Sequence, residues 1–357
     1  MRNSVRKRTF GPWHVLTASV PKPARASDGS ENQDAVSWWE DANVLAVAVA
    51  DGHGSSRSFR SARGARLAAG VAIDVLRDYA GEPIDDAVLR TVAEQLVEKW
   101  RAAVLADLDG DPISDEELAG AGVARNVVSA DHFRVYGSTL LAALLTGEQG
   151  TIWQLGDGDV VAATDDEVWE PVPRDPQLVA NETTSLCLLD ASRHVRTGLL
   201  QDVTGLQLLL LGTDGVSNAM PEGWQRETAL DLVGQLQVHG SDTVGAQLPA
   251  WLAEWAGHSG DDVTVALVHP RHEPPPAGDS TASELTKTSR TTDEEASGRI
   301  QTLVLAENDI GEPRTRETEP EGEPRRRAVR WPVVLGVVGA AVLLAVVGMA
   351  ASAWLWW

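Results

Sequence analysis

Five short segments of the sequence place an aspartate at the end of a predicted strand or in the turn just after it. They read ENQDA, VADGHGS, LGDGD, GTDGVSN and GDDVT, and they contain Asp34, Asp51, Asp157, Asp214 and Asp261. In three of them Gly lies beside the Asp, where it permits a sharp turn and lets backbone carbonyls approach a bound ion. Carboxylate and carbonyl oxygens suit hard cations such as Mg²⁺ or Mn²⁺, and the Cys/His spacing of a zinc site is absent. Two such ions ~3.5–4 Å apart can hold a hydroxide between them and neutralise charge on a phosphoryl group.

Each segment alone is weak evidence, because an Asp-Gly pair is most often an ordinary turn. The inference depends on all five occurring in one chain, each beside an apolar run. These runs predict strands at residues 13–20, 35–39, 44–50, 139–145, 150–155, 160–164, 206–211 and 263–268. Helical spacing predicts helices at residues 61–79, 85–106, 226–237 and 242–255, with Asp85 as an N-cap. Hairpin-length gaps separate many strands, which favours an α+β fold with largely antiparallel sheets.

Composition bounds the class of protein. The chain has 357 residues, of which 43 % are hydrophobic and 23 % charged, as expected of a globular protein. Its formal net charge of -22 argues against a nucleic acid partner, since phosphate backbones require clusters of Lys and Arg. The single cysteine, Cys187, excludes an intramolecular disulfide framework and indicates a reducing compartment.

The C-terminal part differs from residues 1–270, which we expect to form the catalytic domain. Residues 271–330 are rich in Pro, Glu, Thr and Ser and end in basic residues, so we expect a disordered acidic stalk. Residues 331–357 carry no charge, and as a helix of about 40 Å they would cross a membrane as a tail anchor. The preceding arginines predict a single-pass protein of the cell membrane with its large N-terminal part in the cytoplasm. A buried core helix is the alternative interpretation of the apolar segment.

The motifs NQDA, DGHGSS, YGSTL, GDGD, TDGVSN and DDVT occur in this order. Together they resemble the type-2C (PPM-type) metal-dependent serine/threonine protein phosphatase family over nearly all of residues 15–268. The motif NQD and the later ETTSL make the chain most similar to a bacterial branch of that family. The resemblance implies a β-sandwich of two antiparallel sheets flanked by helices, with the metals at one edge. To this the C-terminal segment would add one transmembrane helix.

The resemblance also implies roles for individual residues. Asp51 would bridge two Mn²⁺ or Mg²⁺ ions, with the carbonyl of Gly52 as a ligand of one of them. Asp214 and Asp261 would complete the other site.

Three further residues would complete the centre. Asp34 would support the metals through water or hydrogen bonds, and Asp157 would contribute to a third, weaker site. A hydroxide bridging the ions would attack phosphorus in line, without a phosphoenzyme. His53 would be the general acid for the leaving oxygen, since an imidazole with a pKa of ~6.5 suits that role near neutral pH. A purely structural histidine is the alternative for His53.

Two positions depart from the family pattern. Many relatives carry Glu where this chain has Gln33, and a phosphate-clamping Arg where it has Gly29. Arg25, Arg57 and Arg60 are candidates to replace that Arg, although solvation at the surface is the commoner use of each. The departures put metal affinity and phosphate binding in question.

The function implied is hydrolysis of phosphoserine and phosphothreonine on proteins at the cytoplasmic face of a membrane, a signalling role. Phosphorylated proteins would be the partners, including serine/threonine kinases or their substrates, since tethering raises the local concentration of substrates on the same surface. A pseudophosphatase that binds phosphoproteins or a kinase without turnover is the main alternative. A hydrolase of small phosphorylated metabolites is a third hypothesis.

Overall fold

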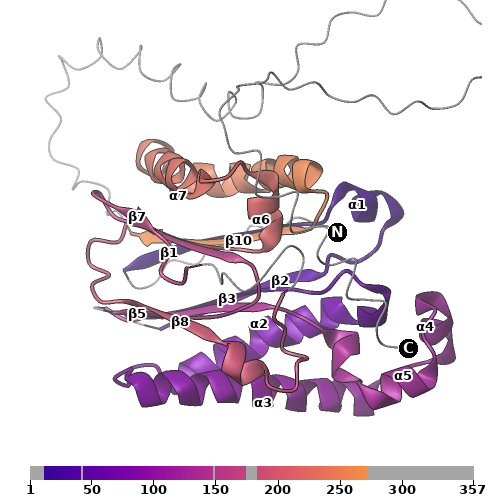
Figure 1. The fold of residues 1–357 in the computed structure, drawn as a ribbon. Helices are drawn as coiled ribbons and strands as arrows, with labels where there is room; N and C mark the ends of the chain where they lie inside the picture. Colours follow the sequence, from indigo (N-terminus) through magenta and orange to yellow (C-terminus); the bar gives the residue numbers. More distant parts are fainter. Residues whose placement is uncertain (1–11, 42, 148, 174–182, 272–357) are drawn as a thin grey trace, which may run out of the picture. The chain divides into compact units, whose positions relative to one another are not determined.

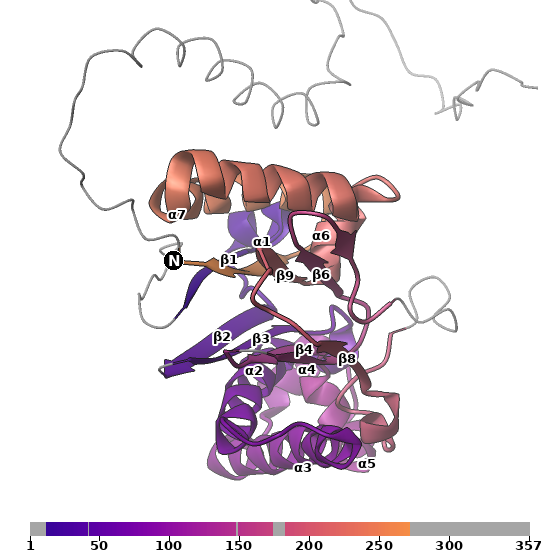
Figure 2. The same ribbon diagram turned by 90° about the vertical axis from the view of Figure 1, so that its left-hand side faces the viewer.

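Two antiparallel sheets of five strands each lie face to face, with helices on both outer sides (Figures 1 and 2). The computed structural model describes residues 12–41, 43–147, 149–173 and 183–271, and the structural statements below concern those residues. All of them belong to one compact unit of the chain, residues 1–289. The predicted α+β sandwich of two antiparallel sheets flanked by helices is confirmed.

The two sheets are assembled from strands that are distant in sequence. The first sheet contains, in spatial order, β1 (Trp13–Val20), β10 (Val263–Pro270), β9 (Leu208–Gly212), β6 (Asp159–Ala163) and β7 (Val168–Trp169). The second sheet contains, in spatial order, β2 (Asp34–Asp41), β3 (Val44–Asp51), β4 (Leu140–Leu145), β5 (Gly150–Leu155) and β8 (Arg196–Leu200). Because all pairs are antiparallel, the start of one strand lies beside the end of its neighbour.

Strand β3 shows why the sequence builds two layers. Successive side chains of a strand point to opposite faces of the sheet. The larger side chains of β3 enter the core between the sheets, and they are Leu45, Val47 and Val49. The small ones face the helical layer, and they are Ala46, Ala48 and Ala50. Helix α2 contributes four alanines to the same buried cluster, and they are Ala65, Ala68, Ala69 and Ala72. Two surfaces of methyl groups allow the helix to pack closely on the sheet.

Seven helices occur among the described residues. They are α1 (Pro23–Asp28), α2 (Ser61–Asp78), α3 (Asp86–Gly110), α4 (Asp115–Ala121), α5 (Arg125–Ala130), α6 (Asp214–Ala219) and α7 (Trp224–Ser259). Short 3₁₀ turns lie at Ser56–Ser58, Phe133–Tyr136 and Ala191–His194. Helices α2 and α3 cover the second sheet, and α7 covers the first (Figure 2). Each sheet therefore has one face in the central core and one face under helices.

The long helices follow the prediction closely. Helix α3 begins after Asp85, whose side chain accepts hydrogen bonds from the N–H groups of Ala87 and Val88, as expected of an N-cap. The predicted helices at residues 226–237 and 242–255 are both parts of α7, which is interrupted at Gly240 with φ 73° and ψ 164°. Only Gly adopts that backbone conformation readily, so the predicted break is real even though the two halves abut.

Short and peripheral elements escaped prediction. Strand β7 has two residues, and β8, with the sequence RTGLL, is an edge strand with exposed side chains. Helices α1, α4, α5 and α6 each have six or seven residues, too few for a helical period to show. Helix α4 did carry a usable signal, since Ser114 and Glu117 form a capping box.

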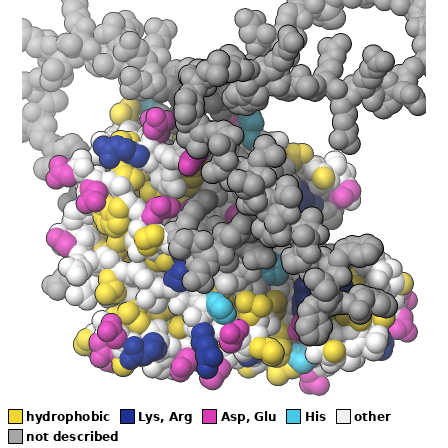
Figure 3. All heavy atoms as spheres, in the orientation of Figure 1, with side chains coloured by type: hydrophobic (Ala, Val, Ile, Leu, Met, Phe, Trp, Pro, Cys, Tyr) yellow, Lys and Arg dark blue, Asp and Glu magenta, His cyan; other side chains and the backbone are white. Residues whose placement is uncertain are grey.

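The C-terminal predictions fall almost wholly outside the described residues. Of the predicted stalk, residues 271–330, only Arg271 is described, and none of the predicted membrane helix, residues 331–357. Within the described ranges, no helix combines the length and the apolar character needed to span a membrane. On the face in Figure 3, acidic side chains of the described part are interspersed with basic and apolar ones.

Candidate metal centre

Antiparallel pairing gathers the predicted aspartates at one edge of the sandwich. Asp51 is the last residue of β3, and its partner in the register of β2 is Asp34, the first residue of that strand. Asp214 follows β9, and Asp261 lies just before β10, the strand paired with β9. Asp34 thus begins β2 and Asp261 precedes β10, whereas the prediction had placed both at the end of a strand or just after it. The antiparallel direction of the pairs brings both arrangements to the same edge.

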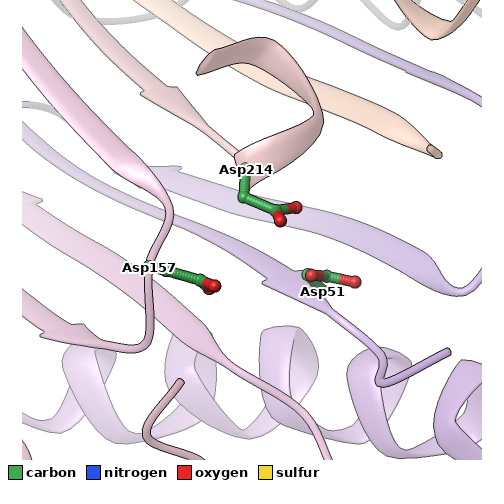
Figure 4. Close-up of side chains that lie close together, drawn as sticks. All are labelled: Asp51, Asp157 and Asp214. Carbon is green, nitrogen blue, oxygen red and sulfur yellow. The ribbon is translucent and has the colours of Figure 1, made fainter. Parts of the chain in front are cut away.

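Three of these carboxylates converge. One oxygen from each of Asp51, Asp157 and Asp214 lies within 4.8 Å of the others, and the three side chains point toward a common space (Figure 4). Asp51 comes from the second sheet, and Asp214 is the first residue of α6, just after β9 of the first sheet. Asp157 lies in the turn between β5 and β6, where the chain passes from one sheet to the other. The site therefore depends on how the two sheets are stacked.

Burial and like charge disfavour the ionised forms of Asp34, Asp51 and Asp214. Burial raises the pKa of Asp51 well above its usual range, and the charges of Asp34 and Asp214 raise it further. Burial raises the pKa of Asp34 to about 7, with a further contribution from the charge of Asp262. A raised carboxyl pKa means that the ionised form lacks a compensating positive charge.

Asp214 follows the same pattern. Burial raises the pKa of Asp214 to about 6, and the charges of Asp157 and Asp261 act in the same direction. A divalent cation would relieve this repulsion, and an all-oxygen donor set is the one that Mg²⁺ and Mn²⁺ prefer. The residues present therefore fit a hard divalent cation held by Asp51, Asp157 and Asp214.

Gly52 allows the backbone to approach the neighbouring segments. Its N–H donates to the carbonyl oxygen of Gln33 at 3.0 Å. A Cβ at this position would lie 2.6 Å from the carbonyl oxygen of Ser61 and 2.7 Å from that of Gln33. Any larger residue would push the end of β3 away from β2. The predicted role of the Gly52 carbonyl as a metal ligand stays a prediction.

Two threonines hold the turn that carries Asp157. The hydroxyl of Thr183 donates to a carboxylate oxygen of Asp157 at 3.0 Å, and the N–H of Gly156 donates to the hydroxyl of Thr184 at 2.9 Å. Gly156 itself has φ 112°, which favours glycine. The sequence analysis used these threonines only as part of the ETTSL motif and did not predict that they orient a carboxylate. The one sequence feature that could have indicated this role is the pair of adjacent hydroxyl side chains.

Asp34 is 7 % exposed and lies opposite Asp51 in the register of β2 and β3. It accepts a hydrogen bond of 2.9 Å from the hydroxyl of Thr213, the residue directly before Asp214. Asp34 is therefore connected by hydrogen bonding to the segment that positions Asp214. It is not one of the three carboxylates that converge within 4.8 Å.

Asp261 lies at the margin of the centre, and its neighbour Asp262 had not been singled out from the sequence. One carboxylate oxygen of Asp261 accepts hydrogen bonds from Lys22 Nζ at 3.2 Å and from the N–H of Asp262 at 2.9 Å. Asp262 is 2 % exposed and is bound by the N–H groups of Lys22 and Gln33. Arg25 donates to Asp262 and to the side-chain oxygen of Gln33. Arg25 is thus held in a buried ion pair, and the expectation of a solvated surface arginine is wrong for it.

Arg60 is also bound to partners outside the metal centre. Only 3 % exposed, it donates to both carboxylate oxygens of Glu117 at 2.7 and 2.8 Å. It further donates to the hydroxyl of Tyr136 at 2.8 Å and to the carbonyl oxygen of Asp111 at 2.7 Å. These bonds raise the pKa of the Arg60 guanidinium and leave it unable to reach a substrate. The expectation of surface solvation is wrong for Arg60, whereas Arg57 is exposed as expected.

His53 lies beside the three carboxylates and is half-buried. Its N–H donates to the carbonyl oxygen of Gly137 at 3.1 Å. The ring lies against the same residue, since a Cβ on Gly137 would be 2.5 Å from His53 Cδ2. Burial lowers the pKa of the imidazole; the charge of Asp157 opposes this and that of Arg134 adds to it. The effect of the Asp157 charge shows that the ring lies within electrostatic reach of that carboxylate.

Comparisons with known proteins point to one family. A family model described as protein phosphatase 2C matches residues 23–255. A bacterial serine phosphatase structure is 14 % identical with a TM-score of 0.50, covering 73 % of this chain and 98 % of its own. The Mycobacterium tuberculosis serine/threonine phosphatase PstP/Ppp is 18 % identical with a TM-score of 0.44, covering 73 % and 99 %. RsbX in complex with magnesium is 15 % identical with a TM-score of 0.44, covering 75 % and 100 %. No match was found among curated protein sequences.

Proposed function

The chain belongs to the protein phosphatase 2C family, and from that membership we propose that it dephosphorylates phosphoserine and phosphothreonine on proteins at a membrane. The family makes it a metal-dependent serine/threonine phosphatase. The observation that carries the proposal is the convergence of Asp51, Asp157 and Asp214 within 4.8 Å at the edge of the sandwich. These carboxylates, together with that of Asp261, would hold Mn²⁺ or Mg²⁺, with Asp34 in support. When bound, two such ions activate a water molecule for attack on phosphorus and neutralise charge on the phosphoryl group.

The protein's own residues would orient the centre and manage the proton. Thr183 fixes the carboxylate of Asp157, and Thr213 links Asp34 to the start of α6. His53 would donate a proton to the serine or threonine oxygen as it leaves. Its lowered pKa makes the protonated ring a stronger acid, which favours proton transfer to an alkoxide.

The membrane location is a part of the proposal that rests on sequence. Residues 331–357 carry no charge, and Arg325, Arg326, Arg327 and Arg330 precede them, which favours a cytoplasmic catalytic domain. Substrates on the same membrane, including serine/threonine kinases or their targets, would then meet the enzyme at a raised local concentration. Flotation of the full chain with lipid vesicles, beside a chain that ends at residue 330, tests this part.

The decisive experiment measures dephosphorylation of a phosphothreonine peptide by the full chain with Mn²⁺, with Mg²⁺ and with chelator. Asp51→Ala and Asp214→Ala should each lower turnover by at least about 100-fold, because each removes a charge that holds the ions. Asp166→Asn, which changes an exposed turn residue, is the matched control. Turnover that persists in chelator or in both variants would contradict the proposal.

A pseudophosphatase is the second candidate, and one observation favours it. The side-chain oxygen of Gln33, at the position where many relatives carry Glu, accepts from Arg25 and so is already engaged. A folded chain that binds phosphopeptide without turnover, with either metal, would support this candidate over the enzyme.

A further inference from the structure

Lys22 is attached through its backbone to the turn that carries Asp261 and Asp262. Its N–H donates to a carboxylate oxygen of Asp262 at 2.9 Å. Arg25, on the helix that starts directly after Lys22, donates to the other carboxylate oxygen of Asp262. Residues 22–25 are therefore attached to the turn that carries Asp261.

The side chain of Lys22 turns toward Asp261 itself. Its ammonium lies 3.2 Å from Oδ1 of Asp261, with 25 % of the Lys22 side chain and 45 % of the Asp261 side chain exposed. The same oxygen accepts the N–H of Asp262 at 2.9 Å. Asp261 is also absent from the group of carboxylates that converge within 4.8 Å. The contacts thus direct Oδ1 of Asp261 toward Lys22.

We propose that Lys22 competes with the divalent cation for the carboxylate of Asp261. The inference rests on the proposed metal centre and adds a determinant of its affinity. An ammonium and a cation cannot both use the same carboxylate oxygen at contact distance, so the Lys22–Asp261 pair must open when Asp261 binds an ion. The positive charge of Lys22 also repels an ion at that place. The ion that needs Asp261 is therefore held more weakly than it would be without Lys22.

The structure contains a closely matched pair for comparison. Lys99 Nζ lies 3.1 Å from Oδ2 of Asp78, with 46 % and 65 % of the two side chains exposed, so this pair has the same chemistry and a similar length but is more exposed than Lys22–Asp261. Asp78 is the last residue of α2, whose first residue, Ser61, lies next to Gly52. The 18 residues of that helix span about 27 Å, so Lys99 is remote from the metal centre. Loss of Lys99 should change the free energy of unfolding by about as much as loss of Lys22, but it should not change the affinity for Mn²⁺.

The test is direct Mn²⁺ binding to the full chain by titration calorimetry in the absence of substrate. Lys22→Met should tighten the weaker class of Mn²⁺ sites about two- to ten-fold, as expected for removal of a partly exposed competitor and its charge. Lys22→Arg, which keeps the charge, and Lys99→Met should stay within about two-fold of the unmodified chain. Thermal unfolding in chelator serves to confirm that all variants fold.

The outcomes separate the inference from the proposed function. Tighter Mn²⁺ binding in Lys22→Met supports the inference even if no phosphopeptide is turned over, in which case only the proposed function fails. Equal binding in Lys22→Met and Lys99→Met, or weaker binding in Lys22→Met, overturns the inference while leaving phosphatase activity untouched. Absence of Mn²⁺ binding in every variant overturns both.

Discussion

Asp34 and Asp51 face each other across the first rung of the β2–β3 pair, at the edge where β2 begins and β3 ends. Asp51 joins Asp157 and Asp214 in the converging group, whereas Asp34 is outside that group and accepts a hydrogen bond from Thr213. Of these two paired aspartates, Asp51 would thus bind the metal and Asp34 would support the centre. Their different surroundings lead to different expectations for the same substitution.

Asp51→Asn should abolish measurable Mn²⁺ binding, because it removes a charge from the middle of the donor set. Asp34→Asn should weaken binding only about 10- to 100-fold, since the amide oxygen can still accept from Thr213 and only the supporting charge is lost. Titration calorimetry with Mn²⁺ measures both effects. Equal losses in the two variants would contradict the division into binding and supporting roles.

His53→Asn should lower turnover of a phosphoserine peptide by about 10²- to 10⁴-fold, the usual contribution of a general acid. Turnover of 4-nitrophenyl phosphate should fall far less, because nitrophenolate leaves without being protonated. Steady-state kinetics on both substrates, with Mn²⁺ affinity as the control, measures the contrast. A similar loss on both substrates would indicate that His53 acts through the structure of the 52–54 loop.

Gly64→Ala should destabilise the protein by about 3 kcal/mol, because its Cβ would lie 1.8 Å from the carbonyl oxygen of Tyr136. Gly70→Ala, in the same helix, has no atom within 4 Å of the added Cβ and should stabilise by about 0.5–1 kcal/mol. Urea unfolding in chelator compares the two. Destabilisation by both substitutions would contradict the close approach of α2 to the segment before Gly137.

Glu117→Gln should lower the free energy of unfolding by about 1.5–3 kcal/mol at pH 7, because the buried Arg60 loses its anionic partner. The hydrogen bonds from Arg60 lower the pKa of Glu117 to about 2 from its usual 4.5. The folded state thus favours the ionised carboxylate, and this stability is complete above pH 4.5 and is lost as the pH falls toward 2.

The difference in stability between the unmodified chain and Glu117→Gln should therefore be constant from pH 7 to pH 5 and shrink below it. Denaturant unfolding at several pH values, with the exposed Glu116→Gln as the neighbouring control, measures this difference. A difference that is independent of pH down to pH 3 would show that the ion pair is not the source of the stability.

The sequence by itself determined the elements whose signals are local. Strands β1 and β5 have the predicted bounds, and Asp85 caps α3 as its position before an apolar helical period implied. The aspartates also lie next to strands, because turn residues and apolar alternation can be read over a few neighbouring positions. These signals led to the α+β class and, through the motifs, to the family, whose resemblance implied the sandwich of two sheets. Edge strand β8 and the short helices were not predicted, because each has too few residues to show a strand or helix period.

Only the tertiary structure decided which charged groups meet. The family resemblance assigned Asp261 to a principal metal site and Asp157 to a weaker one, whereas in the structure Asp157 joins the converging carboxylates and Asp261 pairs with Lys22. The sequence also did not show that Arg25 and Arg60 are buried against partners distant in the chain. Such pairings depend on the stacking of two sheets and on the water that this stacking excludes. Burial converts an ordinary surface charge into one that must find a partner, and no local pattern reports it.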